Sequence, residues 1–365
     1  MTSFLIFIVL ILVAISVWQI TKIFELSQVG ADNSQIANDK DNKINGYLMF
    51  GFLVFIYVIT IICFAKYGHL PLIGNAASEH GAGLDTLMQI SMALIFVVQI
   101  ITQALLYYFA FKYRGEKGKK ALFYADNDRL EFIWTIIPVI TLAGLILYGL
   151  FTWTEIMDVD IEEDDPLVVE LYAQQFNWKV RYAGADNTLG SANVRFLNDY
   201  EGKNVTGIDD SDPSGMDDVV STTELRLPKG RKVLFKMRSQ DVLHSAYMPH
   251  FRAQMNCVPG MITQFSFTPS KTTEEMRATD KISKKVEDIN EIRRDKNKEI
   301  REFNIGKAPE DQKSELDPYT FDYLLLCNKI CGTSHYNMQL KIVVEEEEDF
   351  NKWLSEQQTF AQVIQ

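Results

Sequence analysis

Hydrophobic positions divide this chain into an apolar first half and a polar second half. Four long apolar runs occur before residue 154, and each approaches the roughly 20 residues that a helix needs to cross a bilayer. These runs cover residues 4–20, 48–65, 87–111 and 132–153. We therefore predict four membrane-spanning helices. The first is expected to be a retained anchor, because no Lys or Arg precedes Phe4 and no small-residue cleavage signal follows before Lys22.

The loop charges predict how these spans are oriented. The segment 112–129 contains six Lys and Arg residues, whereas the segment 67–85 contains none. Because cytoplasmic loops are enriched in basic residues, we expect the first segment inside and the second outside. The polar half then lies on the outer side of the membrane.

The polar half has the pattern of a β-domain. Short runs rich in Val, Ile, Phe, Tyr and Leu are separated by turn residues, and no regular helices lie between most of them. The predicted strands are residues 167–173, 176–183, 232–237, 261–268, 321–327 and 339–344. We expect an all-β sandwich or barrel with antiparallel strands.

Two segments interrupt this pattern. Residues 198–218 are rich in Asp, Gly, Ser and Asn, which predicts a solvated loop; an acidic docking surface and a weak cation site are the alternatives. Residues 272–303 are heavily charged, with Ile282, Val286, Ile289 and Ile292 at helical spacing. They predict an amphipathic helical insertion that begins at a Thr272–Glu275 capping box. We expect this helix to lie on the surface of the domain; a role in contacting a partner protein is the alternative.

Composition narrows the classes of partner and cofactor. The 365 residues carry a net charge of −12, which argues against nucleic acid and favours a basic partner. Four cysteines are too few for a disulfide scaffold of this size. No Cys-x-x-Cys-His motif is present in the sequence, so we expect no covalently attached c-type haem.

The segment from Cys327 to Met338 concentrates metal-ligating side chains. It also contains Cys331 and His335, and it directly follows a predicted strand. Sulfur and imidazole ligands favour copper or zinc over hard cations, and a Met ligand is more typical of copper. One Cys with His and Met would indicate a mononuclear copper site, whereas two Cys allow both sulfurs to bridge a pair of metals. A disulfide is the alternative. The best candidate for a second imidazole is His244, which follows the strand 232–237.

Together these motifs resemble subunit II of the haem–copper cytochrome c oxidases. The family pattern Cys-x-Glu-x-Cys-Gly-x-x-His-x-x-Met matches at positions 327–338, except that Lys329 replaces Glu. The Asp-Val-x-His-Ser pattern matches at 241–245, and Glu-x-Ile-Trp-Thr-x-x-Pro matches at 131–138. The resemblance covers roughly residues 87–354.

The resemblance implies a cupredoxin-like domain that holds the dinuclear copper centre called CuA. Cys327 and Cys331 would bridge two coppers, and His244 and His335 would each bind one of them. Met338 would be a weak ligand, and Lys329 would contribute its backbone carbonyl. Haem and the third copper, CuB, would be present only in the partner subunit I.

The resemblance also implies roles for two aromatic residues, a glutamate and Lys329. Where the family has an aromatic motif before the copper loop, this chain has Phe176 and Trp178, and we expect electrons to arrive there; a core strand aromatic is the alternative for Phe176. Glu131 is expected near a proton-uptake pathway, with a helix-start carboxylate as the alternative. Because the family Glu helps to hold a magnesium ion, Lys329 predicts that no side chain of this subunit ligates magnesium.

The predicted function is electron transfer within a terminal oxidase of a bacterial inner membrane. Electrons from a c-type cytochrome, or from a cytochrome-containing supercomplex partner, would pass through the copper centre to subunit I, where oxygen reduction is coupled to proton translocation. Other membrane subunits and lipid are further expected partners. A membrane-anchored copper chaperone and a copper-free quinol oxidase subunit are the alternatives.

The predicted domains are two additional helices (1–66), a helical hairpin (67–158), the copper domain (159–354, with its insertion at 272–316) and a tail (355–365).

Overall fold

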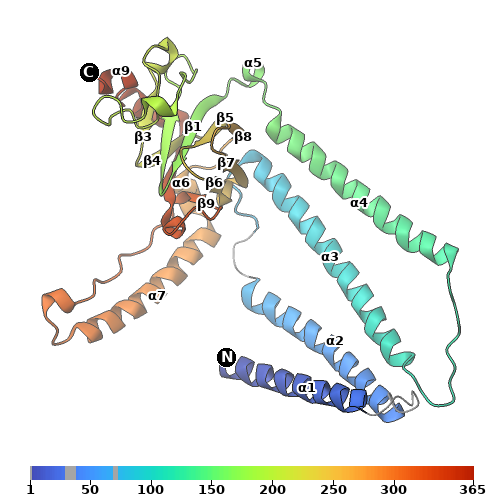
Figure 1. The fold of residues 1–365 in the computed structure, drawn as a ribbon. Helices are drawn as coiled ribbons and strands as arrows, with labels where there is room; N and C mark the ends of the chain where they lie inside the picture. Colours follow the sequence, from blue (N-terminus) through green and yellow to red (C-terminus); the bar gives the residue numbers. More distant parts are fainter. Residues whose placement is uncertain (1, 29–37, 69–72) are drawn as a thin grey trace. The chain divides into compact units, whose positions relative to one another are not determined.

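The computed structural model describes residues 2–28, 38–68 and 73–365 (Figure 1). Within them, four helices are long and apolar enough to cross a membrane. They are α1 (Thr2–Gln28), α2 (Asp39–Tyr67), α3 (Glu79–Lys112) and α4 (Asp128–Met157). Each contains one of the predicted spans, so the four predicted helices are confirmed.

The long helices begin where polar side chains satisfy their first backbone N–H groups. Asn38 Oδ1 accepts a hydrogen bond from the N–H of Asp41 at 2.9 Å at the start of α2. Asn127 Oδ1 accepts one from the N–H of Leu130 at 3.1 Å at the start of α4. These capping residues explain why each helix begins several residues before its apolar run.

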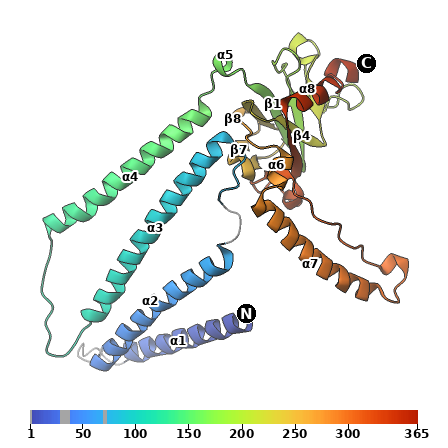
Figure 2. The ribbon, with the colours of Figure 1, turned by 180° about the vertical axis from the view of Figure 1, so that it is seen from behind.

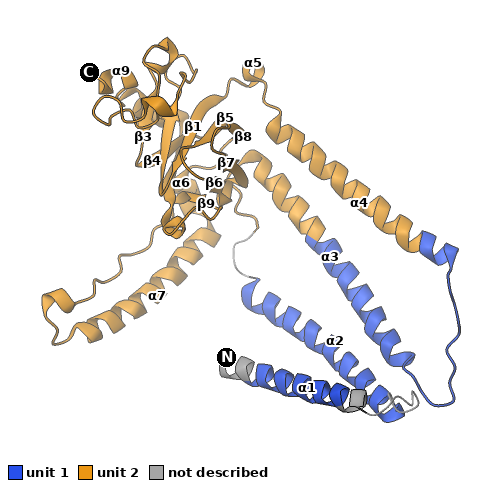
Figure 3. Cartoon of the chain, in the orientation of Figure 1, with its two compact units in different colours: residues 1–70, 92–132 blue, residues 71–91, 133–365 orange. Residues whose placement is uncertain are grey.

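The chain forms two compact units (Figure 3). Residues 1–70 and 92–132 make up the first unit, in which the hydroxyl of Tyr57 on α2 donates to the carbonyl of Ile100 on α3 at 2.9 Å. Residues 71–91 and 133–365 make up the second unit. The second unit therefore combines the first part of α3 and nearly all of α4 with the whole β-domain.

The β-domain is a sandwich of two five-stranded sheets. One sheet has the order β3-β2-β1-β5-β8, and the other has the order β4-β10-β9-β6-β7. Aromatic and aliphatic side chains from both sheets fill the core between them, among them the fully buried Trp178, Phe235 and Tyr323. The strands are β1 (Leu167–Gln174), β2 (Asn177–Tyr182), β3 (Val219–Ser221), β4 (Glu224–Pro228), β5 (Val233–Ser239), β6 (His244–Met248), β7 (Ala253–Cys257), β8 (Thr263–Phe267), β9 (Tyr323–Cys327) and β10 (Gln339–Glu345).

The sandwich prediction is confirmed, but the strands are not all antiparallel. β1 pairs with β5 in parallel, and β10 pairs with β4 in parallel. Both pairs join strands that are far apart in sequence, so long connections replace the hairpins that antiparallel neighbours use. The prediction also missed β3, β4, β6 and β7, which are all five residues or fewer.

The helical insertion is divided into two helices. α6 (Thr273–Arg277) begins at the predicted Thr272–Glu275 capping box, and α7 (Asp280–Asn304) extends away from the β-domain (Figure 2). The apolar stripe packs at its start, where Ile282 is fully buried, but Ile292 is 57% exposed. Further along α7, the side-chain amide of Asn297 forms two hydrogen bonds with Leu316 in the segment that returns to the β-domain. Its nitrogen donates to the Leu316 carbonyl at 2.9 Å, and its oxygen accepts from the Leu316 N–H at 2.8 Å.

The acidic loop is less solvated than its composition predicts. Asp218 is completely buried, and its carboxylate lies 3.2 Å from Nη1 of the equally buried Arg181. Arg181 Nε also lies 2.8 Å from Glu170, so the loop is tied to the sheet through a buried ionic network. The remaining short helices are α5 (Ile161–Asp164), α8 (Glu347–Ser355) and α9 (Phe360–Val363).

Candidate metal centre

Strand pairing brings the two predicted metal-ligating segments to one edge of the sandwich. β6 and β9 run antiparallel, with Ala246 opposite Cys327. His244, at the start of β6, therefore lies beside Cys327, at the end of β9. The loop after β9 returns to β10, and a hydrogen bond of 3.1 Å from the N–H of Cys327 to the carbonyl of Met338 closes it.

The predicted ligand atoms converge in this loop. Sγ of Cys327 lies 3.8 Å from Sγ of Cys331 and 3.8 Å from Nδ1 of His244. On the other side, Sγ of Cys331 lies 3.5 Å from Nδ1 of His335 and 3.8 Å from Sδ of Met338. Each sulfur thus has its own imidazole nitrogen, and the two sulfurs lie between the two histidines.

The main chain adds an oxygen at the same place. The carbonyl oxygen of Lys329 is 3.2 Å from Sγ of Cys327, whereas the Lys329 residue is exposed. The candidate ligand side chains on the inner side of the loop are buried instead: His244 is fully buried, and Met338 is 2% exposed. The protein therefore keeps water away from one side of the sulfur pair.

A carboxylate from the β5–β6 connection and the backbone of the β1–β2 turn hold the centre in place. Oδ1 of Asp241 is 2.8 Å from Nε2 of His244, which fixes the ring with Nδ1 towards the sulfurs. The other oxygen of Asp241 accepts a 2.7 Å hydrogen bond from the N–H of Gln175. Burial opposes ionisation of Asp241, but these hydrogen bonds outweigh it and hold the pKa of the carboxyl below its usual value.

The thiols are chemically suited to a metal rather than to a disulfide. Both cysteines are free, and their sulfurs are far beyond the ~2.05 Å of a disulfide bond. Burial, and then the hydrogen bond to Cys327, raises the pKa of Cys331 to about 11. A bound metal reverses this preference because a coordinating thiol is deprotonated. Two sulfurs, two imidazoles and a thioether match the preferences of copper, and one imidazole for each sulfur fits a pair of ions.

The two predicted aromatic residues lie next to this centre. The ring of Trp178 makes an edge contact with the ring of His244, with centroids 6.3 Å apart. Phe176 lies in the turn between β1 and β2, and its ring packs against the backbone of Gly332 in the metal loop. Glu131 is in the first turn of α4 and belongs to the other compact unit.

Three residues of the site were not predicted from sequence. Asp241 is three residues before His244, and this spacing could have identified it as the group that orients the ring. Gly332 belongs to the matched family pattern, but its contact with Phe176 was not predicted, and Gln175 gave no signal. Gln175 also donates its side-chain amide to the carbonyl of Cys331, although it lies in the β1–β2 turn, 156 residues away in sequence.

Comparisons with known proteins match most of this architecture. The family model described as cytochrome c oxidase subunit II, transmembrane domain, matches residues 68–151. The model described as cytochrome c oxidase subunit II, periplasmic domain, matches residues 167–275. The second match therefore includes His244 but ends before the Cys327–Met338 loop, from which the α7 insertion separates it.

Individual relatives agree with the family models. An alternative cytochrome c oxidase subunit 2 of Bradyrhizobium diazoefficiens is 31% identical over 255 residues, which are 70% of this chain and 73% of the relative. A cytochrome c oxidase subunit 2 of Thermostichus vulcanus is 21% identical over 83% of this chain and 84% of its own length. A probable quinol oxidase subunit 2 of Staphylococcus saprophyticus is 25% identical over 66% of this chain and 57% of its own length.

Proposed function

Because this chain belongs to the subunit II family of cytochrome c oxidases, we propose that the converging loop residues are its copper ligands. Cys327 and Cys331 would supply the thiolates that hold both ions, and His244 and His335 would each supply an imidazole nitrogen to one of them. Met338 and the carbonyl of Lys329 complete the set. The sulfur pair with one imidazole nitrogen for each sulfur is the observation that supports this assignment most strongly.

The chain is the electron-transfer subunit of a membrane-bound terminal oxidase, and its copper domain is outside the cytoplasm. It associates with subunit I and other oxidase subunits. The copper pair held by these residues would supply one-electron redox chemistry between the donor and haem in subunit I. The residues of the site hold both imidazoles in fixed orientations and keep one side of the sulfur pair dry, which limits the rearrangement that accompanies a change of charge.

The electron donor of this oxidase is a c-type cytochrome or a protein that contains one. The full set of copper-binding side chains supports this donor over a quinol, although one relative is named as a probable quinol oxidase subunit. The net charge of −12 favours a basic donor. The purified oxidase should therefore oxidise ferrocytochrome c with oxygen. Oxidation of a quinol at a comparable rate, with ferrocytochrome c left reduced, would overturn this assignment.

Electrons reach the copper centre by way of Phe176 and Trp178. Phe176 contacts the backbone of the metal loop, and Trp178 contacts a ligand ring, so the two aromatics form a short path of packed rings and main chain. In the variant Phe176→Leu, electron transfer from ferrocytochrome c should slow while copper content stays unchanged. Phe303→Leu, on the exposed end of α7, is the matched control. Equal rates in the two variants would exclude a role for Phe176.

The remaining expected roles are part of the same proposal. Glu131 takes part in proton uptake, and no side chain of this subunit binds magnesium, because Lys329 presents a cation where the family has a carboxylate. The two additional helices contact further membrane subunits. The domain borders follow the predicted segments, with the copper domain at residues 159–354. A copper chaperone, the alternative function, is not favoured by relatives that are oxidase subunits.

A further inference from the structure

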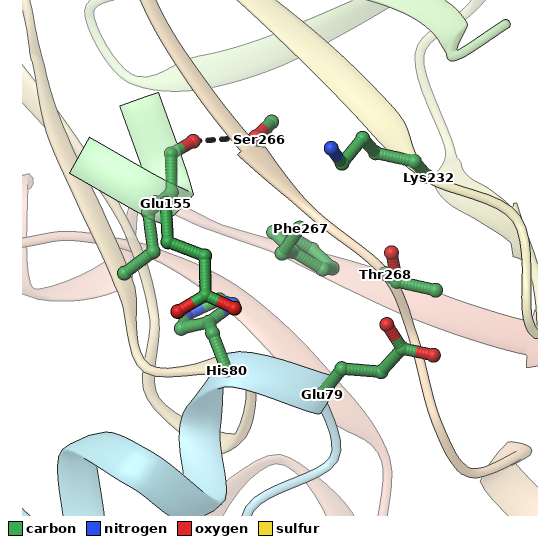
Figure 4. A pocket seen from close by; sticks show the side chains of 8 residues that line it. Glu79, His80, Glu155, Lys232, Ser266, Phe267 and Thr268 are labelled. Carbon is green, nitrogen blue, oxygen red and sulfur yellow. Dashed lines mark hydrogen bonds between the residues drawn. The ribbon is translucent and has the colours of Figure 1, made fainter. Parts of the chain in front are cut away.

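A second group of metal-ligating side chains lies far from the copper loop in sequence, around a cavity of about 150 Å³ (Figure 4). The cavity is open on one side. It is lined by the start of α3, the end of α4, the residue before β5 and the end of β8, all within the second compact unit. Its polar lining includes the imidazole of His80 and two carboxylates. The lining residues are Glu79, His80, Glu155, Ile156, Lys232, Ser266, Phe267 and Thr268.

The imidazole of His80 has one nitrogen free for a ligand. Its Nε2 atom is shielded from solvent and has no hydrogen-bond partner. The backbone of Phe251 and Arg252 hydrogen-bonds the ring, and this bond must therefore be made by Nδ1. Because a backbone carbonyl accepts the Nδ1 hydrogen, the neutral ring has an unshared electron pair on Nε2. This arrangement is the one found in histidines that bind metal ions.

Carboxylate groups from two different helices accompany this nitrogen. Figure 4 shows Glu155 reaching from α4 to the ring of His80, and the two groups interact electrostatically. Glu79, which precedes His80 at the start of α3, lines the same cavity. Lys232 also lines it, but the Lys232 ammonium is paired with Asp164 at 2.7 Å. Because Lys232 pairs with Asp164, it does not neutralise the negative charges of Glu79 and Glu155 in the cavity.

The walls of the cavity are fixed by hydrogen bonds that do not involve these ligands. The hydroxyl of Ser266 on β8 donates to the carbonyl of Ile156 on α4 at 2.7 Å. The N–H of Glu79 donates to the carbonyl of Thr268 at 3.1 Å. The backbones that carry the three side chains are thus held together before any ligand binds.

We propose that His80, Glu155 and Glu79 form a binding site for a divalent transition-metal ion such as Zn²⁺. One imidazole nitrogen with carboxylate oxygens suits this class of ion, and water completes the coordination. Among the described residues, only His244, Cys327 and Cys331 already place three such atoms within 4.8 Å of one another. Binding at the second site therefore requires the exposed side chain of Glu79 to turn towards His80.

A metal at this position has a structural consequence. It connects the outer end of α3 to that of α4, and both helices contact β8 there. The ion would thus join the two helices of the membrane hairpin at the place where both lie against the end of β8. This inference does not depend on the assignment of the copper ligands, because the two sites share no residue.

The test is the zinc content of the purified, assembled oxidase after equilibrium dialysis against Zn²⁺ alone. The wild-type complex should retain one more Zn²⁺ than complexes with His80→Asn or Glu155→Gln, and copper content should be equal in all of them. His250→Asn is the matched control, because that ring packs against Phe321 and Tyr323 and does not line the cavity. Equal zinc content in the wild-type, His80→Asn and control complexes would overturn the proposal.

If a variant fails to assemble, a second measurement on the wild-type complex alone still tests the proposal. X-ray absorption at the zinc edge should show nitrogen and oxygen ligands at about 2.0–2.2 Å, with the multiple-scattering signature of an imidazole. An adventitious surface ion would show oxygen ligands without an imidazole, and that result would contradict the proposed site.

Discussion

Nε2 of His244 lies 2.8 Å from Oδ1 of Asp241, on the side of the ring that faces away from the two cysteine sulfurs. The carboxylate fixes both the orientation of the ring and the nitrogen that carries the hydrogen. Since Gln175 in turn holds Asp241, the position of a proposed copper ligand depends on the β1–β2 turn, which contributes no proposed ligand.

Asp241→Asn should therefore weaken copper binding without removing a ligand. Loss of such a supporting group typically lowers metal affinity by about 10- to 100-fold. Copper retained per complex during titration with a chelator measures the effect. The control is Asp322→Asn, which removes a carboxylate just before β9, at the end of the strand opposite to Cys327. If both variants retain copper equally well, the His244–Asp241 hydrogen bond has no role in the centre.

Gly332→Ala should disturb the metal loop for two reasons. Gly332 has a φ of +144°, and a Cβ there would lie 2.8 Å from Cζ of Phe176 and 2.9 Å from the side-chain nitrogen of Gln175. We expect lower copper occupancy and an altered copper spectrum. Gly306→Ala separates backbone strain from the steric clash, because Gly306 also has a positive φ of +76° but nothing lies within 4 Å of the added Cβ. A normal copper spectrum in Gly332→Ala would show that the loop tolerates displacement from Phe176.

Glu131→Gln should slow turnover severalfold while the copper signal stays the same, because the proposed role is proton uptake. The alternative is a favourable interaction of the carboxylate with the start of α4. Asp128→Asn tests this alternative, since Asp128 lies in the same first turn. Steady-state oxygen consumption is the measurement. Unchanged turnover in Glu131→Gln, or equal slowing in both variants, would reject the proton-uptake role.

Asp218 should make the stability of the copper domain depend on pH. Burial raises the pKa of its carboxyl from 3.8 to about 7 in the folded protein, even though Arg181 acts in the opposite direction. Between these values the folded state holds a proton that the unfolded chain has released, so this group's contribution falls as pH rises from about 4 to about 7. Asp218→Asn removes that dependence while leaving Arg181 paired with Glu170.

The Asn variant should consequently gain stability relative to the wild type as pH is raised from about 5 to about 8, by about 3 kcal/mol at most, because the proton difference persists over only about two pH units of this range. Thermal unfolding of the full chain, followed by tryptophan fluorescence, measures the difference in melting temperature at each pH. Asp199→Asn, an exposed position in the same loop, should follow the wild type at both values. A constant difference between Asp218→Asn and wild type would contradict the buried-proton account.

The sequence predicts those parts of the fold and site that depend on local patterns. The apolar runs determine the membrane helices, and the Cys327–Met338 motif contains most of the proposed ligands within one loop, so both could be identified directly. The role of Gln175 could not, because it arises from the packing of distant strands. The burial of Asp218 was also missed, since an Asp-rich loop has the composition of a solvated segment whether or not an arginine lies beneath it.

We propose that Cys327, Cys331, His244 and His335 hold two equivalent copper ions. In the oxidised complex the two ions would share one unpaired electron. Low-temperature electron paramagnetic resonance of the oxidised complex tests it most directly. Two equivalent copper nuclei give a seven-line hyperfine pattern, and this pattern should be lost when either cysteine is replaced by serine. A four-line spectrum from a single copper in the wild-type complex, or no copper signal together with a disulfide between Cys327 and Cys331, would contradict the account.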